Sequence, residues 1–421
     1  MNSLRSRQED IKARLLLHLR FSVIRDREDR IASALTDTFE WIYDNEIPET
    51  GQFTWNPFVR WLKSNSGLYW IAGKAGSGKS TLMKFLHSDP RTKEHLGVWA
   101  HASTLVIAGH FFWNSGNSIQ MAVEGLIRTL LYDIGTQLPG VLPDLFPERW
   151  AEMESSLDPK LVVLQPWTTF ECLQAFRKIL FHPFNHYKFF FFVDGLDECT
   201  GDHEELTALL KEMASSPHIK MCLASRPWSV FQDAFNSSPS LMLQQLTSRD
   251  ISLYVRTKFY KNRGFLELEK SNSKLAAQLC DDITEKASGV FLWVRLVVLS
   301  LLRGITNGDR VIDLTRRLDD LPEDLGMLFS KILDSVDPAY KLHSAQLFQI
   351  HRTASEYHDG ISLLRFSYAD DHDRALCDEE ERSLNRDEFV YRVKSMDRRL
   401  DSRTKGLLET PTSFIDEIED K

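Results

Sequence analysis

The chain has 421 residues, of which 43% are hydrophobic and 26% charged, and its formal net charge is −9. It is long enough for two or three domains, and its composition is ordinary for a globular protein. The negative charge argues against a general nucleic-acid-binding protein. Five scattered cysteines without C-x-x-C spacing indicate neither a disulfide framework nor a zinc site, and they predict a reducing, cytoplasmic setting. No secretory signal and no membrane span are expected.

The N-terminal residues 1–62 are expected to form a helical segment. Apolar residues recur at helical spacing over 8–44, which predicts one helix through 11–19 and another through 31–42. The stretch FTWNPFVRWL, residues 53–62, is rich in large aromatic side chains. We expect it to plug the edge of a sheet, and a stacking surface for adenine is the alternative.

The most informative stretch is LYWIAGKAGSGKSTL, residues 68–82. It matches the phosphate-loop pattern G-x-x-x-x-G-K-[ST] in full. A strand over 68–72 would lead into a loop whose backbone N–H groups close around a phosphate, and the next helix would add its N-terminal dipole. A glycine turn that binds nothing is the alternative, but such a turn has no need of Lys-Ser directly after glycine.

This loop predicts a nucleotide site with divided roles. Lys79 is expected against the β- and γ-phosphates, and the Ser80 hydroxyl is expected on Mg²⁺. The residues expected to bind nucleotide are Gly73, Lys74, Ala75, Gly76, Ser77, Gly78, Lys79, Ser80 and Thr81.

Further strands and helices are expected between this loop and residue 187. After a polar stretch at 88–95, a second strand is expected over 105–113 and a helix over 121–135. The proline-rich stretch 138–166 is expected to be a long connection, followed by a helix over 170–180.

A second informative stretch, YKFFFFVDGLDECTGDHEEL, covers residues 187–206. Its apolar run 189–193 is typical of a central parallel strand buried on both faces. Asp194, Asp197 and Glu198 follow at the carboxyl end, where ligands bind in open α/β sheets. We therefore expect a site for Mg²⁺ and for activation of water. A solvated acidic turn is the alternative.

A fourth strand, over 219–224, is followed by Ser225, Arg226 and Pro227. Arg226 would emerge at the same edge of a parallel sheet, where a guanidinium can bind a γ-phosphate through two hydrogen bonds. An arginine that merely caps the strand is the alternative. A fifth short strand is expected over 241–246.

From residue 247 onward the pattern is helical. Helices are expected over 251–259, 275–287, 290–302, 311–318, 325–336 and 339–350. The basic run 392–405 has Val393, Met396 and Leu400 on one helical face. We expect that face to be buried, and contact with nucleic acid is the alternative.

The motifs GKAGSGKST, DGLDE and SRP, followed by a helical region, resemble those of NACHT-type NTPases of the STAND superfamily. The stretches HFFWNSG, GLIRTLLYDI and ITEKASGVFLWVRLVVLSLL are more closely similar to the nephrocystin-like, NLR-like NACHT proteins of filamentous fungi. The resemblance implies an α/β P-loop NTPase with a parallel sheet of strand order 5-1-4-3-2, followed by an all-helical and winged-helix-like region. The implied domains are a NACHT domain over 63–246, a helical domain over 247–305 and an incomplete winged-helix-like domain over 306–421.

The resemblance also implies roles for individual residues. Lys79 and Asp194 correspond to the Walker A lysine and the Walker B acid, and Ser80 and Asp194 would hold Mg²⁺. Asp197, or failing it Glu198, would polarise the attacking water, and Arg226 would be the sensor arginine. The adenine-contacting Gly-x-Pro turn of the family corresponds to residues 289–291, Gly-Val-Phe.

The function that the resemblance implies is an ATP/ADP switch with slow Mg²⁺-dependent hydrolysis. In the ATP state such a protein assembles with copies of itself or with family members. The alternative is a scaffold that holds nucleotide and regulates full-length relatives without significant ATPase activity. Nucleic acid is not an expected partner, and no motif indicates ATP over GTP.

Overall fold

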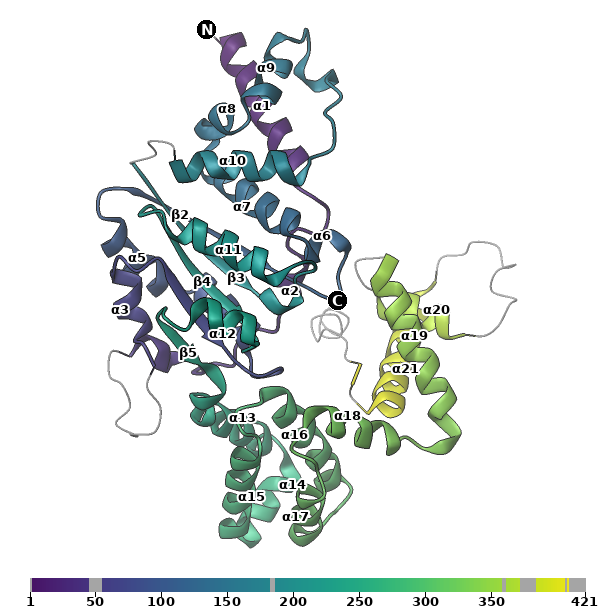
Figure 1. Cartoon of the computed structure of the whole chain (residues 1–421). Coiled ribbons are helices and arrows are strands. Elements are labelled where there is room, and N and C mark those ends of the chain that lie inside the picture. Colours follow the sequence, from purple (N-terminus) through teal and green to yellow (C-terminus); the bar gives the residue numbers. More distant parts are fainter. Residues whose placement is uncertain are drawn as a thin grey trace. The chain divides into compact units, whose positions relative to one another are not determined.

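The computed structural model describes residues 2–44, 55–181, 186–357, 361–371, 384–405 and 407–408. The chain divides into two compact units (Figure 1). The first unit comprises Met1–Tyr254 and Gly289–Phe291, and the second comprises Val255–Ser288 and Leu292–Lys421.

The first unit is built on a five-stranded parallel sheet in the order β2-β3-β4-β1-β5. The predicted order 5-1-4-3-2 is therefore confirmed. The strands are β1 Leu68–Ala72, β2 Thr104–Phe111, β3 Tyr187–Asp194, β4 Ile219–Ser225 and β5 Ser240–Met242. The fifth strand is shorter than expected because residues Leu243–Gln245 form a 3-10 turn, η5.

The central strand β3 is buried on both faces, as its unbroken apolar run predicts. Phe189 and Phe191 pack into one core, and Phe190 and Phe192 pack into the other. Helices α7 Val123–Gln137, α10 Thr169–Phe181, α11 His203–Ala214 and α12 Ser229–Phe235 cover the first face, and α1 Asn2–Leu19 packs on the outside of α7 (Figure 1). Helices α3 Phe58–Lys63, α4 Lys79–Ser88 and α5 Pro90–Ala100 cover the second.

Of the two helices predicted in the N-terminal segment, the structure confirms one and contradicts the other. The first is confirmed as α1, whose apolar face packs against α7. The second, over 31–42, is wrong: the structure has α2 Asp26–Arg30 and a 3-10 turn η1 Glu40–Tyr43 instead. Asp37 and Phe39 have φ angles of 66° and 64°, which end any right-handed helix, and the Thr38 hydroxyl donates to the Leu35 carbonyl.

Two stretches expected to be irregular contain helices. The connection 138–166 contains α8 Leu142–Leu145, α9 Pro147–Ser155 and the 3-10 turns η2 Pro139–Val141 and η3 Pro159–Leu161. The polar stretch 88–95 begins α5, with Asp89 as its N-cap and Pro90 as its first residue. The prolines that suggested loops instead occupy first-turn positions, where a helix needs no N–H group.

The aromatic stretch before β1 packs against the sheet. Phe53 lies outside the described residues, whereas Trp55, Phe58 and Trp61 are buried. The rings of Trp61 and Tyr69, on β1, lie 5.0 Å apart. These side chains form the expected hydrophobic plug, but it packs on a face of the sheet and not at its edge, and none of the three offers an open face to a base.

Residues of the second unit that the structure describes form helices and turns only. The chain enters this unit within α13 Ser248–Tyr260. The helices that follow are α14 Arg263–Ser271, α15 Ser273–Lys286, α16 Phe291–Thr306, α17 Val311–Asp319, α18 Leu325–Asp334, α19 Lys341–Tyr357, α20 Leu363–Asp370 and α21 Arg386–Thr404. The sequence prediction missed α14 and α20. No helix in the described ranges is both long and apolar enough to cross a membrane.

Small elements complete the connections. They are α6 Ser118–Met121, η4 Leu196–Glu198 and η6 Pro338–Tyr340. Of these, η4 directly follows β3 and carries two of the predicted acidic residues.

Candidate functional site

The phosphate loop connects the end of β1 to the start of α4. Gly78, the N-cap of α4, has a φ of 95°, a left-handed conformation that favours glycine. The Ser77 hydroxyl is buried and has no hydrogen-bond partner in the described part of the chain. Such a buried polar atom is costly unless a ligand or water satisfies it, so the loop is suited to a polar ligand.

The Lys79 ammonium is folded back over this loop. Its Nζ donates to the carbonyl oxygens of Gly73 and Lys74, at 2.8 Å and 3.0 Å. Burial lowers the pKa of Lys79, while the nearby carboxylates of Asp197 and Asp194 oppose this shift. Among the described residues, this half-buried cation has backbone carbonyls as its hydrogen-bond partners, and phosphate oxygens could replace them with a stronger, charged interaction.

Asp194 ends β3, and only 1% of its surface is exposed. Neither carboxylate oxygen has a hydrogen-bond partner of good geometry among the residues described. Burial raises the pKa of Asp194 to about 6, against the opposing influence of the Ser80 hydroxyl, Arg27 and Lys79. A buried carboxylate with unused oxygens beside a serine hydroxyl fits a cation.

This donor set suits Mg²⁺ bound together with a nucleotide. Mg²⁺ is commonly held by one or two protein oxygens, substrate phosphates and water. The described residues contain no group of three or more His, Cys, Asp or Glu side chains that could cage a metal by themselves. Ser80 and Asp194 would therefore hold the ion in the company of phosphates.

Asp197 lies in η4 and pairs with Arg226, at the end of β4. The Arg226 Nε lies 2.9 Å from Asp197 Oδ2, and the Arg226 backbone N–H donates to Oδ1 at 2.9 Å. The structure thus brings together the predicted water-activating acid and the predicted sensor arginine. Their charges face each other, which was not expected from the sequence.

Glu198 is tied to the end of the neighbouring strand. Its Oε2 accepts a hydrogen bond of 2.9 Å from the backbone N–H of Asn114. Phe112, two residues earlier, donates to the carbonyl oxygen of Asp194 at 3.0 Å. The β2 end and the β3 end are therefore joined on both sides of Asp194.

The stretch 289–291 returns to the phosphate loop. Gly289 has a φ of 77°, and a Cβ atom there would lie 2.1 Å from the Gln244 carbonyl oxygen. The Gln244 side chain accepts a hydrogen bond of 3.2 Å from the Lys74 backbone N–H. The rings of Phe291 and Phe39 lie within 4 Å of the position that a Cβ at Gly78 would occupy. Two aromatic rings and Gln244 thus support the loop.

A hollow of about 450 Å³ lies alongside α4. Residues 33–38 and Glu40 line one side of it, and Thr81, Lys84, Phe85, Ser88 and Asp89 line the other. Its volume falls in the range of small-molecule sites. Thr81 directly follows the predicted Mg²⁺ ligand Ser80, so the hollow begins next to the phosphate loop.

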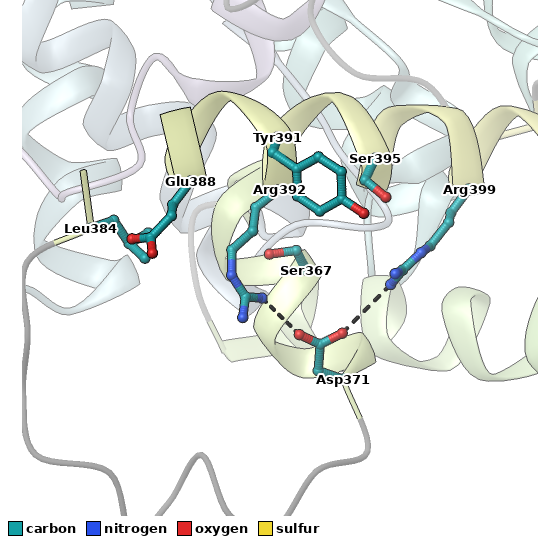
Figure 2. A pocket seen from close by; sticks show the side chains of 8 residues that line it. All are labelled: Ser367, Asp371, Leu384, Glu388, Tyr391, Arg392, Ser395 and Arg399. Atoms are coloured by element: carbon teal, nitrogen blue, oxygen red, sulfur yellow. Dashed lines mark hydrogen bonds and ion pairs between the residues drawn. The ribbon is translucent and has the colours of Figure 1, made fainter. Parts of the chain in front are cut away.

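The basic run predicted as a possible nucleic-acid contact lies on α21. Figure 2 shows Arg392 and Arg399 directed at Asp371, with Arg392 Nη1 2.6 Å from its Oδ2. Arg399 also pairs with Asp370 at 2.9 Å. The apolar face of α21 packs into a core with α19 and α20, as predicted. The two arginines are thus occupied by carboxylates, which weakens the case for phosphate binding.

Two residues near the site carry no recognisable sequence signal. Arg27, on α2, influences Asp194, and Asp250, on α13, accepts hydrogen bonds from Phe39 and Trp41. Neither belongs to a motif, and their positions depend on tertiary packing. The helical spacing through residues 31–42 pointed to a different local structure.

The parallel sheet order, with a phosphate loop after β1 and an acid at the end of β3, defines a P-loop NTPase fold. Residues 49–226 match the family model described as Nephrocystin 3, N-terminal, and residues 335–420 match a domain of unknown function (DUF7791). The chain is also 22% identical over 332 residues to the vegetative incompatibility protein HET-E-1 of Podospora anserina. These matches confirm the resemblance to nephrocystin-like NACHT proteins of filamentous fungi.

The matches cover different shares of the proteins compared. The alignment with HET-E-1 covers 76% of this chain and 22% of that protein, so the chain spans about a fifth of the length of this relative. Among solved structures, Cdc6p from Pyrobaculum aerophilum is 12% identical with a TM-score of 0.32, covering 84% of each chain. Drosophila ORC bound to DNA is 12% identical with a TM-score of 0.26, covering 85% of this chain and 81% of that chain. At these scores, the fold assignment rests on the sheet itself.

Proposed function

We propose that the chain is a nucleotide-operated switch that binds ATP or ADP with Mg²⁺ and hydrolyses ATP slowly. The observation that carries this proposal is Asp194, a buried carboxylate with two unused oxygens beside Lys79 and Ser80. A bound Mg²⁺ would supply positive charge that offsets the negative charge of the phosphates. Within the chain, Lys79 would exchange its carbonyl partners for phosphate oxygens, and Ser80 and Asp194 would orient the ion.

The switch would act through the helical part of the chain. In the proposed arrangement, 1–62 is an N-terminal helical segment, 63–246 the NACHT domain, 247–305 a helical domain and 306–421 a winged-helix-like domain. Residues 289–291 belong to the first unit although residues on both sides belong to the second. Nucleotide exchange would therefore alter the conformation of the chain where it passes from one unit to the other. The ATP state would assemble with copies of the chain or with relatives. The cytoplasmic setting stays a prediction.

A nucleotide-content assay tests the proposal directly. The purified chain is denatured and the released nucleotide is identified by chromatography, and the size of the native protein is measured with ADP and with a non-hydrolysable ATP analogue. We expect bound ADP or ATP, and a larger species with the analogue. Lys79→Ala should remove Mg²⁺-dependent binding, whereas Lys93→Ala, an exposed lysine on α5, should retain it. Binding that survives Lys79→Ala would contradict the proposal.

A second candidate is a nucleotide-holding scaffold without significant turnover. The Asp197–Arg226 pair favours it, because a carboxylate whose two oxygens both bind an arginine is a weaker base toward water. Turnover separates the two candidates. The scaffold hypothesis is supported if nucleotide co-purifies with the chain while ATP hydrolysis stays at background and is unchanged by Asp197→Asn and Glu198→Gln.

A further inference from the structure

Helix α2 is fixed against the side of α4 that carries the predicted Mg²⁺ ligand. The Lys84 ammonium donates to the carbonyl oxygens of Glu28 at 2.7 Å and Ile31 at 2.8 Å. The His87 Nδ1 lies 2.7 Å from the Glu28 carboxylate. Because Lys84 lies four residues after Ser80, the two side chains share one side of α4. The segment 28–31 is thus held against the middle and the C-terminal end of α4, beginning about one helical turn beyond Ser80.

Arg27 projects from α2 toward the ends of β2 and β3. Its guanidinium carbon lies 5.8 Å from the centre of the Trp113 ring. Trp113 stands between Phe112, which is hydrogen-bonded to the Asp194 backbone, and Asn114, which is hydrogen-bonded to Glu198. The charge of the Arg27 guanidinium lies near enough to the Asp194 carboxylate to interact with it, as does the charge of Lys79. Arg27 and the phosphate-loop lysine therefore act on the same carboxylate.

The hydrogen-bonding capacity of Arg27 is unused. Its Nε is buried and has no hydrogen-bond partner, and no ion pair of its side chain is found within the described ranges. The two neighbouring arginines differ in this respect. Arg25 pairs with Asp133 and Glu28, and Arg30 lies 4.0 Å from Asp26. Only Arg27 of these three presents donors without a carboxylate partner in the described residues.

We propose that Arg27 binds the terminal phosphate of a bound nucleoside triphosphate and so ties α2 to the ends of β2 and β3. The guanidinium fork can donate two hydrogen bonds to phosphate oxygens, and its charge is permanent. With a cation held by Asp194, Arg27 would be available to pair with the phosphate. A diphosphate lacks this group, so Arg27 distinguishes the two nucleotide states. The inference rests on the proposed nucleotide site and adds a residue to it.

The test compares two affinities in the full chain. Fluorescence anisotropy with Mg²⁺ measures the dissociation constants of a fluorescent ATPγS and a fluorescent ADP for the wild type, Arg27→Ala and Arg27→Lys. Arg27→Ala should weaken ATPγS binding at least about tenfold and ADP binding less than about threefold. Arg27→Lys should lie between Arg27→Ala and the wild type, because lysine keeps the charge but loses the fork. The matched control Arg30→Ala, on the same helix and beside the same tryptophan ring, should change neither affinity more than about twofold.

Each outcome of this experiment tests either the role of Arg27 or the proposed nucleotide-binding function. Equal weakening of both nucleotides, or no weakening of either, overturns the role of Arg27. A wild type that binds neither nucleotide overturns the proposed function instead, and is seen before any variant is made. If Arg27→Ala unfolds, Arg27→Gln retains side-chain volume, and the ratio of the two dissociation constants does not depend on the fraction of folded protein.

Discussion

Arg226 and Asp197 are joined by two interactions at the carboxyl edge of the sheet, one from the guanidinium and one from the backbone N–H. The Asp197 side chain is 4% exposed and the Arg226 side chain 41% exposed. Both oxygens of Asp197 are therefore committed to Arg226, and Asp197 acts as a positioning residue. Glu198 uses only Oε2, on Asn114, and its Oε1 has no partner in the described part of the chain.

Glu198 is accordingly the acid that we expect to act on water. Glu198→Gln should slow single-turnover ATP hydrolysis by roughly a hundredfold or more, because the amide cannot accept a proton, and should leave ATP affinity within about threefold. Asp197→Asn should instead weaken binding of the ATP analogue, because Arg226 loses its charged partner. Radioactive phosphate release and fluorescent-nucleotide binding measure the two effects. The reverse pattern, with turnover lost only in Asp197→Asn, would assign the water to Asp197.

Gly289 cannot accept a side chain, because a Cβ there would lie 2.1 Å from the backbone oxygen of Gln244. We expect Gly289→Ala to lower the free energy of unfolding by roughly 3 kcal/mol, from left-handed strain and the forced shift of Gln244. The shift should also break the Gln244 contact with Lys74 and weaken ADP binding. Gly201→Ala is the control: φ is 106°, nothing lies within 4 Å, and only about 1–2 kcal/mol should be lost. Urea denaturation measures both variants. If Gly289→Ala and Gly201→Ala lose the same free energy of unfolding, the close contact between position 289 and Gln244 does not contribute.

The sheet was predictable because its signals are local. An unbroken apolar run, a glycine loop with Lys79 and an acid at Asp194 each belong to one strand and its end. The resemblance to a known family added the strand order and the role of Arg226. These motifs name the residues without giving their partners, so the pairing of Arg226 with Asp197 emerged only from the structure.

The surroundings of the loop were not predictable for a physical reason. Residues 31–42 have helical apolar spacing because Ile31, Phe39 and Ile42 are all buried, but they reach the core from an irregular backbone. Its left-handed residues are stabilised by partners distant in sequence, among them Asp250. Arg27 likewise lies near Asp194 because contacts distant in sequence, among them those of Lys84 and His87, hold α2 in place. Tertiary contacts overrode the local pattern in both cases.

Asp250 fixes the segment that carries Phe39. It is 2% exposed and accepts hydrogen bonds from Trp41 Nε1 at 2.8 Å and from the Phe39 backbone N–H at 3.3 Å. Asp250→Ala should lower the free energy of unfolding by roughly 2–4 kcal/mol, because two donors lose a buried acceptor. Asp233→Ala, at an exposed position on α12, should change it by less than about 0.5 kcal/mol. Limited proteolysis should also cut Asp250→Ala near residues 31–44 first, and unchanged cleavage there would argue against this role.

Lys220 on β4 makes the stability of the first unit depend on pH. It is fully buried, and its Nζ donates to the carbonyl oxygens of Trp61 and Ser66, each at 2.8 Å. Burial, with a smaller contribution from Lys188, lowers the pKa of Lys220 to about 7. Above pH 7 the unfolded chain holds a proton that the folded chain has released, so raising the pH favours the folded state up to the ordinary lysine pKa.

The Lys220→Met variant removes this titration. The free energy of unfolding of the wild type minus that of Lys220→Met should rise by roughly 2 kcal/mol between pH 7 and pH 9. Lys211→Met, an exposed lysine on α11, should show no such slope. Urea denaturation followed by tryptophan fluorescence at several pH values measures both differences. A flat difference for Lys220→Met would mean that the folded chain keeps Lys220 protonated, with the two carbonyl oxygens and the Trp61 ring, 4.3 Å from Nζ, stabilising its charge.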